Sequence, residues 1–416
     1  MSRSGLETGM DRRRLIQGTA LLGGLGALGL GGCATATGQS ISSAIQTSGL
    51  DDRIRLAPIR ASTDRIFDIT VCLRPFRAAG PRLDTEQVGD TLVVHNYGHG
   101  GSGWSLSWGS STIAVQKAMA GSPREIAVLG CGALGLTSAI LAQTAGAQVT
   151  IYAKDLLPDA RSSRATGTWT PDSRIAAADK VAPGFPALWE QMARTSFKTY
   201  RRYLGLPGTP VEWIDRYSLS DDEPSPAPAV TPATPVAAPI ARPRVQFASY
   251  EDRISDLTPK GENMPKGSTP FPTDHVIRDE TMIFNIADYG HTLMTDFRLA
   301  GGKIVHMEFH EPSELARLKE KVVINCSGYG ARALWRDESI VPVRGQIAWL
   351  IPQPEARYAF YYNGVGVVSR RDGIVVQTGG GGMRGYGEDD ETPDRADAER
   401  GVRIVAELYS RMRSAG

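Results

Sequence analysis

The sequence has few cysteines, almost no net charge and no long apolar run. Its 416 residues include 4 cysteines, none in C-x-x-C spacing, which argues against a disulfide framework and against structural zinc. The formal net charge of +1 argues against a nucleic acid as the main partner. The apolar stretch 18–32 is shorter than the roughly 20 residues that a membrane helix needs. We therefore predict no metal site and no nucleic acid partner, in a chain long enough for two domains.

The first 33 residues are typical of an export signal. Arginines at positions 12–14 precede the apolar stretch and resemble a twin-arginine signal, which carries folded proteins. The segment Leu30–Cys33 resembles a lipobox, in which Cys33 carries a lipid anchor, and the alternative is a plain cleaved signal with an incidental cysteine. We predict a signal peptide over 1–33, a tether over 34–53 and a periplasmic location, with or without the lipid anchor.

A glycine-rich turn at 130–135, GCGALG, matches the pattern G-x-G-x-x-G. It follows the apolar run 126–129, which is typical of a buried strand, and it precedes a helical pattern and a second strand at 148–152. Glycines at this spacing allow a tight turn, the approach of a pyrophosphate and close packing of helix on strand. An acidic residue after the second strand accepts the ribose hydroxyls, and Asp155 is the candidate. Because Lys154 precedes it directly, either of these two positions meets the ribose. The pattern predicts dinucleotide binding, against the alternative of a purely structural turn.

A second glycine-rich segment lies at 95–109, HNYGHGGSGWSLSWG. It follows a predicted strand at 91–95 and leads into a predicted helix at about 104–119. The first turn of such a helix offers unpaired backbone N–H groups to an electronegative ligand edge. The alternative is a glycine-rich loop that serves only as a sharp turn.

The remaining pattern is that of an α/β protein with one polar excursion. The small polar segment 159–171 is interpreted as a loop that lies against a ligand, and the Pro/Ala-rich segment 221–243 as an exposed insertion. Further strands are predicted at 66–73 and 321–328, and further helices at 284–300 and 395–413.

Together these motifs resemble the D-amino-acid oxidase family and, more broadly, FAD-dependent amine and amino-acid oxidoreductases. The resemblance implies an α/β fold, with a Rossmann-like FAD-binding domain and a second, mostly antiparallel β-sheet substrate domain. Segment 95–109 is the most specific match, because in this family it lies against the flavin ring. The matching segments are 95–109, 130–135, 151–158, 165–171, 322–334 and 343–347.

The order of the motifs departs from the family. There the equivalent of residues 54–120 follows the C-terminal helix, whereas here it precedes the nucleotide-binding strand, so the chain is interpreted as circularly permuted. Residues 121–123 are long enough to join the two parts if their ends are adjacent. The predicted FAD-binding parts are about 91–180 and 280–345, and the predicted substrate-domain parts are about 54–90, 181–279 and 346–416.

The resemblance also implies roles for individual residues. Arg74 matches the arginine that binds the substrate carboxylate, Tyr362 matches one of two substrate tyrosines, and Gly101 lies near the substrate amine. Gly366 takes the place of the second tyrosine. The residues implied to bind FAD are Gly98, Gly100, Gly101, Ser102, Gly103, Trp104, Ser105, Gly130, Gly132, Ala133, Leu134, Gly135, Lys154, Asp155, Arg161, Ser162, Gly167, Thr168 and Phe309.

The implied function is oxidative deamination of a D-amino acid. Hydride passes from Cα to flavin N5, the products are a keto acid and ammonia, and oxygen or a quinone or other carrier accepts the electrons. The enzyme alternatives are a glycine- or sarcosine-type amine oxidase and a quinone-linked D-amino-acid dehydrogenase on the same scaffold. A flavin-binding lipoprotein without turnover and a nicotinamide-dependent dehydrogenase are alternatives of other classes.

Overall fold

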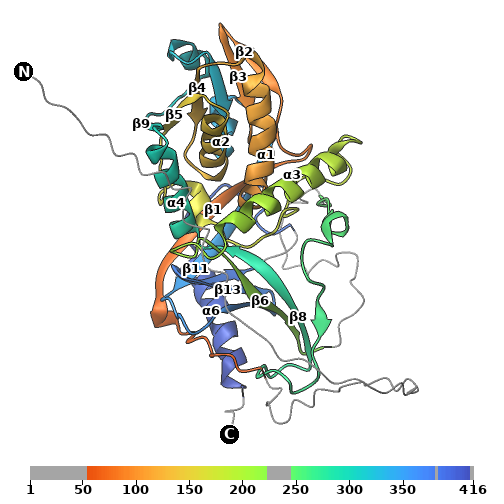
Figure 1. Cartoon of the computed structure of the whole chain (residues 1–416). Coiled ribbons are helices and arrows are strands. Elements are labelled where there is room, and N and C mark those ends of the chain that lie inside the picture. The colour runs from red at the N-terminus through yellow and green to blue at the C-terminus, as the bar shows by residue number, and fades with distance from the viewer. Residues whose placement is uncertain (1–53, 223–244, 380–382, 413–416) are drawn as a thin grey trace, which may run out of the picture. The chain divides into compact units, whose positions relative to one another are not determined.

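The computed structural model describes residues 54–222, 245–379 and 383–412 (Figure 1). These residues belong to one unit, which runs from Asp52 to Gly416, so the segment 54–120 is not a separate domain. The predicted signal peptide and tether, and nearly all of the predicted insertion, lie outside the described residues. Within the described ranges, no helix has both the length and the apolar character needed to cross a membrane.

A six-stranded sheet carries the glycine turn at 130–135. Its strand order is β2-β3-β10-β4-β5-β9, and all pairings are parallel except that of β2 with β3. The apolar run from Ile126 to Leu129 is buried on both faces, as expected of a parallel strand between layers. The strands are β2 (Thr85–Val88), β3 (Thr91–His95), β4 (Glu125–Leu129), β5 (Gln148–Ala153), β9 (Lys303–His306) and β10 (Val322–Asn325).

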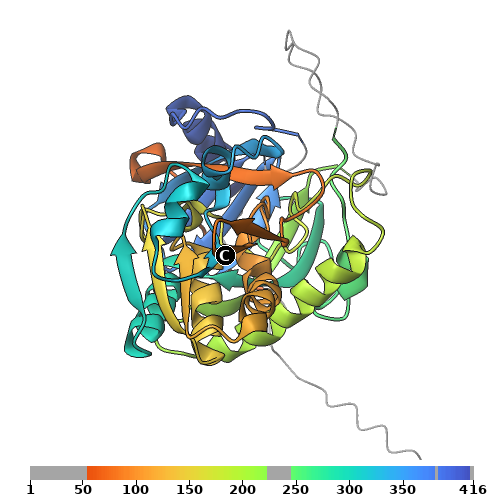
Figure 2. The ribbon, with the colours of Figure 1, turned by 90° about the horizontal axis from the view of Figure 1, so that it is seen from above.

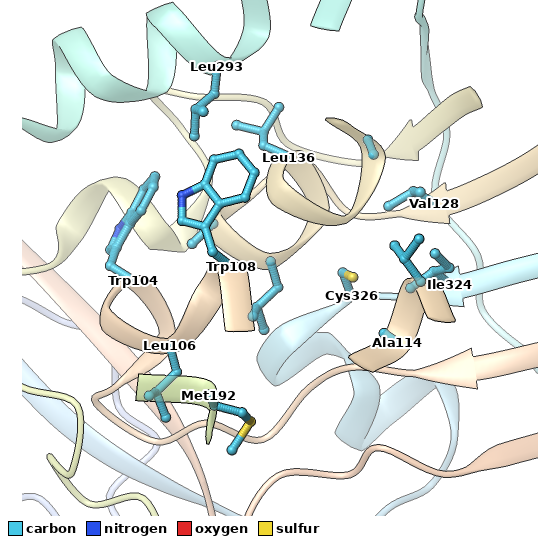
Figure 3. Packing of buried hydrophobic residues seen from close by; sticks show 14 of the residues in the cluster. Trp104, Leu106, Trp108, Ala114, Val128, Leu136, Met192, Leu293, Ile324 and Cys326 are labelled. Carbon is cyan, nitrogen blue, oxygen red and sulfur yellow. The ribbon is translucent and has the colours of Figure 1, made fainter. Parts of the chain in front are cut away.

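Four helices and this sheet share the main apolar core. Figure 3 shows Trp108, Leu136, Leu293 and Ile324 of this cluster, together with Met192. The helices predicted at 104–119 and 284–300 are confirmed within one or two residues at each end. The helices of this part are α1 (Gly103–Ala118), α2 (Ala133–Thr144), α3 (Phe185–Tyr200), α4 (Ile286–Leu299) and the short α5 (Ala331–Leu334).

Helices α1 and α3 approach each other closely because Gly109 has no side chain. A Cβ atom at Gly109 would collide with the backbone of Met192 in α3. Two hydrogen bonds cross the same contact: Gly109 N–H donates to Ser196 Oγ at 2.8 Å, and Ser107 Oγ and Tyr200 Oη lie 2.8 Å apart. The close approach fixes α1, whose first turn follows the glycine-rich segment.

An eight-stranded, mostly antiparallel sheet forms the other half of the unit. Its order is β1-β11-β14-β13-β12-β6-β8-β7, and only β12 and β6 pair in parallel. Helix α6 (Arg395–Ser410) packs its apolar side on this sheet, as predicted for 395–413 (Figure 1). The strands are β1 (Ile66–Arg77), β6 (Val211–Ser220), β7 (Glu262–Asn263), β8 (His275–Phe284), β11 (Ile340–Leu350), β12 (Tyr358–Tyr362), β13 (Val365–Arg370) and β14 (Gly373–Thr378).

The N-terminal part of the described chain contributes to both sheets. β1 pairs with β11 along its whole length, from Ile66 opposite Leu350 to Arg77 opposite Ile340 (Figure 2). β2 and β3 then join the other sheet, where β3 pairs with β10. Two predicted boundaries shift accordingly. The edge strand β2 belongs to the six-stranded sheet although its residues were predicted in the substrate domain, and β11 begins at Ile340, before the predicted boundary at 345.

The contact between α1 and α3 gives a test of the packing. Alanine is normally favoured over glycine inside a helix by about 0.5–1 kcal/mol. We expect Gly109→Ala to destabilise the protein nevertheless, by about 1–3 kcal/mol, because overpacking against a backbone outweighs helix propensity. Gly121→Ala is the matched control, since a Cβ there meets nothing within 4 Å. Chemical denaturation of both variants measures the difference, and a Gly109→Ala protein more stable than wild type would contradict the packing described.

Candidate functional site

A cavity of about 400 Å³ is lined by residues of both sheets and of both glycine-rich segments. Its volume lies within the range of small-molecule binding sites, roughly 300–1,000 Å³. The side of the six-stranded sheet contributes Gly100, Gly101, Gly103, Trp104, Gly132, Ala133, Leu134, Cys326 and Gly328. The eight-stranded sheet contributes Cys72, Arg74, Arg216, Gly345, Ile347, Ala359, Tyr361, Gly366, Val368, Val375 and Gln377.

Two helices begin at this cavity. α1 starts at Gly103 and α2 starts at Ala133, and neither has a side-chain hydrogen bond from its N-cap residue. The first residues of both helices line the cavity wall. The open N–H groups and the helix dipoles of two N-termini therefore converge on one ligand space, which favours an anionic or electronegative group.

The glycines of the 130–135 turn serve different parts of this geometry. Gly130 has φ 96°, and a Cβ there would lie 2.6 Å from the carbonyl oxygen of Cys326, so it allows β4 and β10 to lead into the turn side by side. Gly132 lines the cavity, and a Cβ there would lie 2.5 Å from Ser162 Oγ. That oxygen accepts a hydrogen bond from Ala133 N–H at 3.1 Å. Ser162 therefore orients the start of α2.

The charged residues of the cavity wall are all arginines. No aspartate or glutamate occurs among the lining residues that the structure describes. Carboxylates lie one layer behind instead. Arg216 forms two hydrogen bonds with Asp279, at 2.8 and 2.9 Å, and Glu391 forms ion pairs with both Arg161 and Arg164. The lining arginines are Arg74, Arg161, Arg164, Arg174 and Arg216. This distribution favours a ligand that carries negative charge.

Arg74 extends from β1 across the neighbouring strand β11. A Cβ atom at Gly345 would lie 2.5 Å from Arg74 Cζ, so the glycine makes room for the guanidinium. The hydrogen bond that Arg74 donates, to the Val343 carbonyl oxygen, is long at 3.5 Å. Among the described residues Arg74 has no carboxylate partner. Burial lowers the pKa of the guanidinium. Because it has no carboxylate partner among the described residues, this partly buried cation is suited to binding a carboxylate ligand.

His99 is a buried cavity residue that the sequence analysis left out of the site. Its Nε2 lies 2.7 Å from Ser110 Oγ, whereas its Nδ1 is buried and has no hydrogen-bond partner among the described residues. Burial lowers the pKa of His99 to about 3, so the ring is neutral at physiological pH. His99 lies within segment 95–109, but the sequence of that segment gives no reason to assign the histidine a role in the site.

The structure brings together about half of the residues predicted for the site. Those that line the cavity are Arg74, Gly100, Gly101, Gly103, Trp104, Gly132, Ala133, Leu134, Arg161, Ser162 and Thr168. The others lie outside the cavity wall: Gly98, Ser102, Ser105, Gly130, Gly135, Lys154, Asp155, Gly167, Phe309 and Tyr362.

Some of these others support the wall from behind. Ser102 Oγ donates to the Ser173 carbonyl oxygen at 3.1 Å, and Ser105 Oγ accepts from Thr170 N–H at 2.9 Å. These bonds hold the polar loop predicted at 159–171, and the residues that follow it, against the start of α1. The loop therefore lines the cavity and the two serines contact the loop rather than the cavity, while its predicted contact with a ligand stays a prediction.

Lys154, Asp155 and Phe309 lie at the carboxyl edge of the six-stranded sheet. Lys154 forms an exposed ion pair with Glu308 at 2.8 Å, and Phe309 packs edge-on against Tyr152 with ring centres 6.1 Å apart. This edge is where ligands of open α/β sheets bind. The prediction that these residues bind a ribose stays a prediction.

The role predicted for Tyr362 is corrected by the structure. Its hydroxyl donates to Asp221 at 2.6 Å and is hydrogen-bonded by Arg411, and its ring packs in the apolar cluster under α6. Tyr361 lines the cavity instead. Successive side chains of a strand point to opposite faces, so a shift of one residue moves a tyrosine from the cavity to the far side of the sheet.

Arg370, the last residue of β13, holds the loop of the cavity wall that contains Ala165. Only 1% of its side chain is exposed, and it lies over the Trp349 ring at 4.9 Å from the ring centre. Its Nε donates to Asp372 at 2.8 Å, and its Nη1 donates to the Ala165 carbonyl oxygen at 2.8 Å. The lining residues that follow Ala165 are therefore held by a buried ion pair.

The amino-acid sequence is similar to those of known proteins. Residues 125–415 match the family model described as FAD dependent oxidoreductase (DAO). A D-amino acid oxidase of Dugesia ryukyuensis is 39% identical over 84 residues, covering 20% of this chain and 25% of that protein. A D-amino-acid oxidase of Dictyostelium discoideum is 24% identical over 226 residues, covering 54% of this chain and 56% of that protein. The chain thus spans about a quarter and about half of these two relatives.

A similarity to solved structures was also found. The glycine oxidase from Geobacillus kaustophilus is 12% identical, with a TM-score of 0.43, and the match covers 70% of this chain and 78% of that chain.

The anchoring role of Arg370 can be measured against its neighbour. We expect Arg370→Met to destabilise the protein by about 3 kcal/mol, because it leaves Asp372 without its partner and releases Ala165. Amide hydrogen exchange should accelerate in residues 165–168. Arg371→Met is the matched control, since its side chain is 45% exposed and its pair with Glu212 should contribute less than about 1 kcal/mol. Equal losses of stability in the two variants would show that Arg370 has no special role.

Proposed function

Because the chain belongs to the FAD-dependent oxidoreductase family, whose model matches residues 125–415, we propose that it oxidises a D-amino acid to a keto acid and ammonia. FAD is the cofactor of this family, and when bound it supplies the acceptor for the hydride that leaves Cα. The D-amino acid oxidases that the chain resembles support the choice of isomer. Oxygen and a quinone or other carrier are both candidates for the final electron acceptor.

The cavity suits this cofactor in three respects. The turn at 130–135 and the start of α2 would hold the pyrophosphate, because backbone N–H groups and a glycine without a Cβ meet there. The start of α1 would face the flavin and stabilise negative charge on it. The arginines of the wall add positive charge without a lining carboxylate to oppose it, among the described residues.

The observation that carries the substrate assignment is Arg74 within this cavity. It is a cation without a carboxylate partner among the described residues, in the same cavity as the starts of α1 and α2. A planar guanidinium binds a carboxylate with two parallel hydrogen bonds, which fixes the orientation of the amino acid. The sequence assigned this role to Arg74 by resemblance, and the geometry supports it.

The rest of the wall is suited to orienting a substrate rather than to removing a proton. No carboxylate lines the described cavity, His99 is neutral, and burial raises the pKa of the Cys72 thiol. Ile347, Val375 and their neighbours form an apolar floor that excludes water. The contribution of the chain is then positional, since it places Cα–H toward the acceptor without a strong general base. A glycine- or sarcosine-type oxidase remains the second candidate, because Gly366 opens the wall where the family has a tyrosine.

We also propose that the chain is circularly permuted relative to its family. The family match begins at residue 125, yet β1 and β3 are integral strands of the two sheets. Only residues 119–124 separate the end of α1 from the start of β4. The other junction is also close, because the Tyr358 hydroxyl is hydrogen-bonded to both the Ala57 carbonyl oxygen, at 2.8 Å, and the Tyr409 hydroxyl, at 2.6 Å.

The substrate role of Arg74 is tested by flavin reduction. D-Amino acids should bleach the flavin of the wild-type protein under anaerobic conditions, and Arg74→Ala should lower kcat/KM by roughly 10²–10⁴-fold, through the loss of two charge-assisted hydrogen bonds. Gly345→Ala should lower it by a smaller factor, because the added methyl group displaces the guanidinium. Gly330→Ala, whose Cβ would lie 3.9 Å from Ser327, is the control. If D-amino acids reduce the flavin of the Arg74→Ala variant at the wild-type rate, the substrate role of Arg74 is excluded.

The permutation is tested by restoring the family order. A variant chain that runs from Pro123 to Met412, continues through a flexible linker of about eight residues, and then runs from Ile54 to Ala120 should fold and bind FAD. Such a linker spans roughly 16 Å, which is ample for ends that meet at one tyrosine hydroxyl. Flavin content and melting temperature are the measurements. A soluble variant that binds no flavin would show that the present order is required by the fold.

A further inference from the structure

Three residues form one row across the cavity side of the eight-stranded sheet. Gln377 of β14 is the register partner of Gly366 of β13, and Gly366 is the register partner of Tyr361 of β12. All three line the cavity. Adjacent strands lie about 4.8 Å apart, so the two outer residues of the row start roughly 10 Å from each other. The side chains of a glutamine and a tyrosine therefore flank a residue that has none.

Gly366 leaves open space in the middle of this row. A Cβ atom there would meet only Tyr361 Cδ2, at 4.0 Å, within the distance that ordinary contacts occupy. The backbone of Gly366 is not in the left-handed region, so no turn or strain requires a glycine. The backbone of β13 therefore does not require a glycine at this position, and the absence of a side chain serves to leave space in the cavity.

Gln377 brings an unused amide to the same place. Its side chain forms no hydrogen bond with any residue that the structure describes. It also lines a small polar pocket that adjoins the main cavity and that Arg74 lines as well. A glutamine amide both donates and accepts, so it pairs well with another amide or with a carboxylate. A group of this kind in a cavity wall discriminates strongly when the ligand supplies the complementary atoms.

Tyr361 closes the other end of the row. It is 45% exposed, unlike Tyr362, which is 5% exposed and held under α6 by Asp221. Its ring leans toward Gly366, as the 4.0 Å approach of Cδ2 shows. The tyrosine thus covers the gap from the solvent side while leaving the space above the glycine free.

We propose that Gln377, Gly366 and Tyr361 select the side chain of the substrate, an inference that rests on the proposed oxidation of an amino acid. Gly366 makes room for a side chain of several atoms, Gln377 hydrogen-bonds its polar end, and Tyr361 covers it. The row favours amino acids whose side chain ends in a carboxamide or a carboxylate. The positive cavity wall accommodates either end group, so the experiment below includes both.

The first arm measures flavin reduction by a set of amino acids. Wild type should prefer D-glutamine or D-glutamate over D-methionine, which has similar length without the polar end. Gln377→Leu should lower that preference about 10- to 100-fold. Gly366→Val should lower kcat/KM for the long side chains by about 100-fold and for glycine and D-alanine by less than about threefold. Tyr362→Phe is the matched control on the opposite face of the sheet and should leave every ratio unchanged.

The second arm does not depend on turnover. Calorimetry of the FAD-loaded protein should show that glutaramate and glutarate bind more tightly than hexanoate, and that Gln377→Leu removes the difference. If amino acids reduce the flavin but neither Gln377→Leu nor Gly366→Val changes the ratios, the row has no selective role and the inference is wrong. If no amino acid reduces the flavin, the proposed function fails, and the binding series still decides whether the row recognises polar carboxylic acids.

Discussion

Arg74 is a partly buried cation without a carboxylate to balance it among the described residues, and the proposed site depends on this imbalance. Removing a charge from water costs several kcal/mol when no partner replaces the solvent. The pairing of β1 with β11 supplies the stability that holds the guanidinium in place, and Gly345 supplies the room. A ligand carboxylate offsets part of the cost. The free protein therefore already carries this desolvation cost, and a ligand carboxylate gains affinity by relieving part of it.

One stretch of the chain provides two essential walls of the cavity. Residues 66–77 form β1 with Arg74, and residues 103–118 form α1, whose first turn faces the ligand space. Both precede residue 125, where the family match begins. The matched segment by itself contains the glycine turn at 130–135 and most of the apolar floor, but neither Arg74 nor helix α1. The sheets hold this stretch against the matched segment by pairing β1 with β11 and β3 with β10.

Local patterns in the sequence predicted β1, β3, β4, β5 and β10, the helices α1, α2, α4 and α6, and both glycine-rich segments, but they predicted no strand at β6 or β8. The buried run 126–129 and the helix after Gly103 could be placed from local residue patterns, whereas Arg74 was assigned only by resemblance to the family. Three features had no local signal. Tyr361 and Tyr362 are neighbours of the same type, and only the pairing of β12 decides which one faces the cavity. His99 and Gln377 are recognised only when distant strands place them in one wall. The edge strand β2 has no strong pattern of its own and is defined by its pairing with β3.

The arrangement of charge explains how an arginine-rich cavity keeps its selectivity. Arg216 is held by Asp279, and Arg161 and Arg164 are held by Glu391, so these side chains are oriented before any ligand binds. Their carboxylate partners lie behind the wall, where they stabilise the arginines without presenting negative charge to the cavity. A pre-oriented arginine loses little entropy on binding, and a paired arginine attracts anions less strongly than one without a partner. An anionic ligand is therefore attracted more strongly to Arg74 than to Arg216, Arg161 or Arg164.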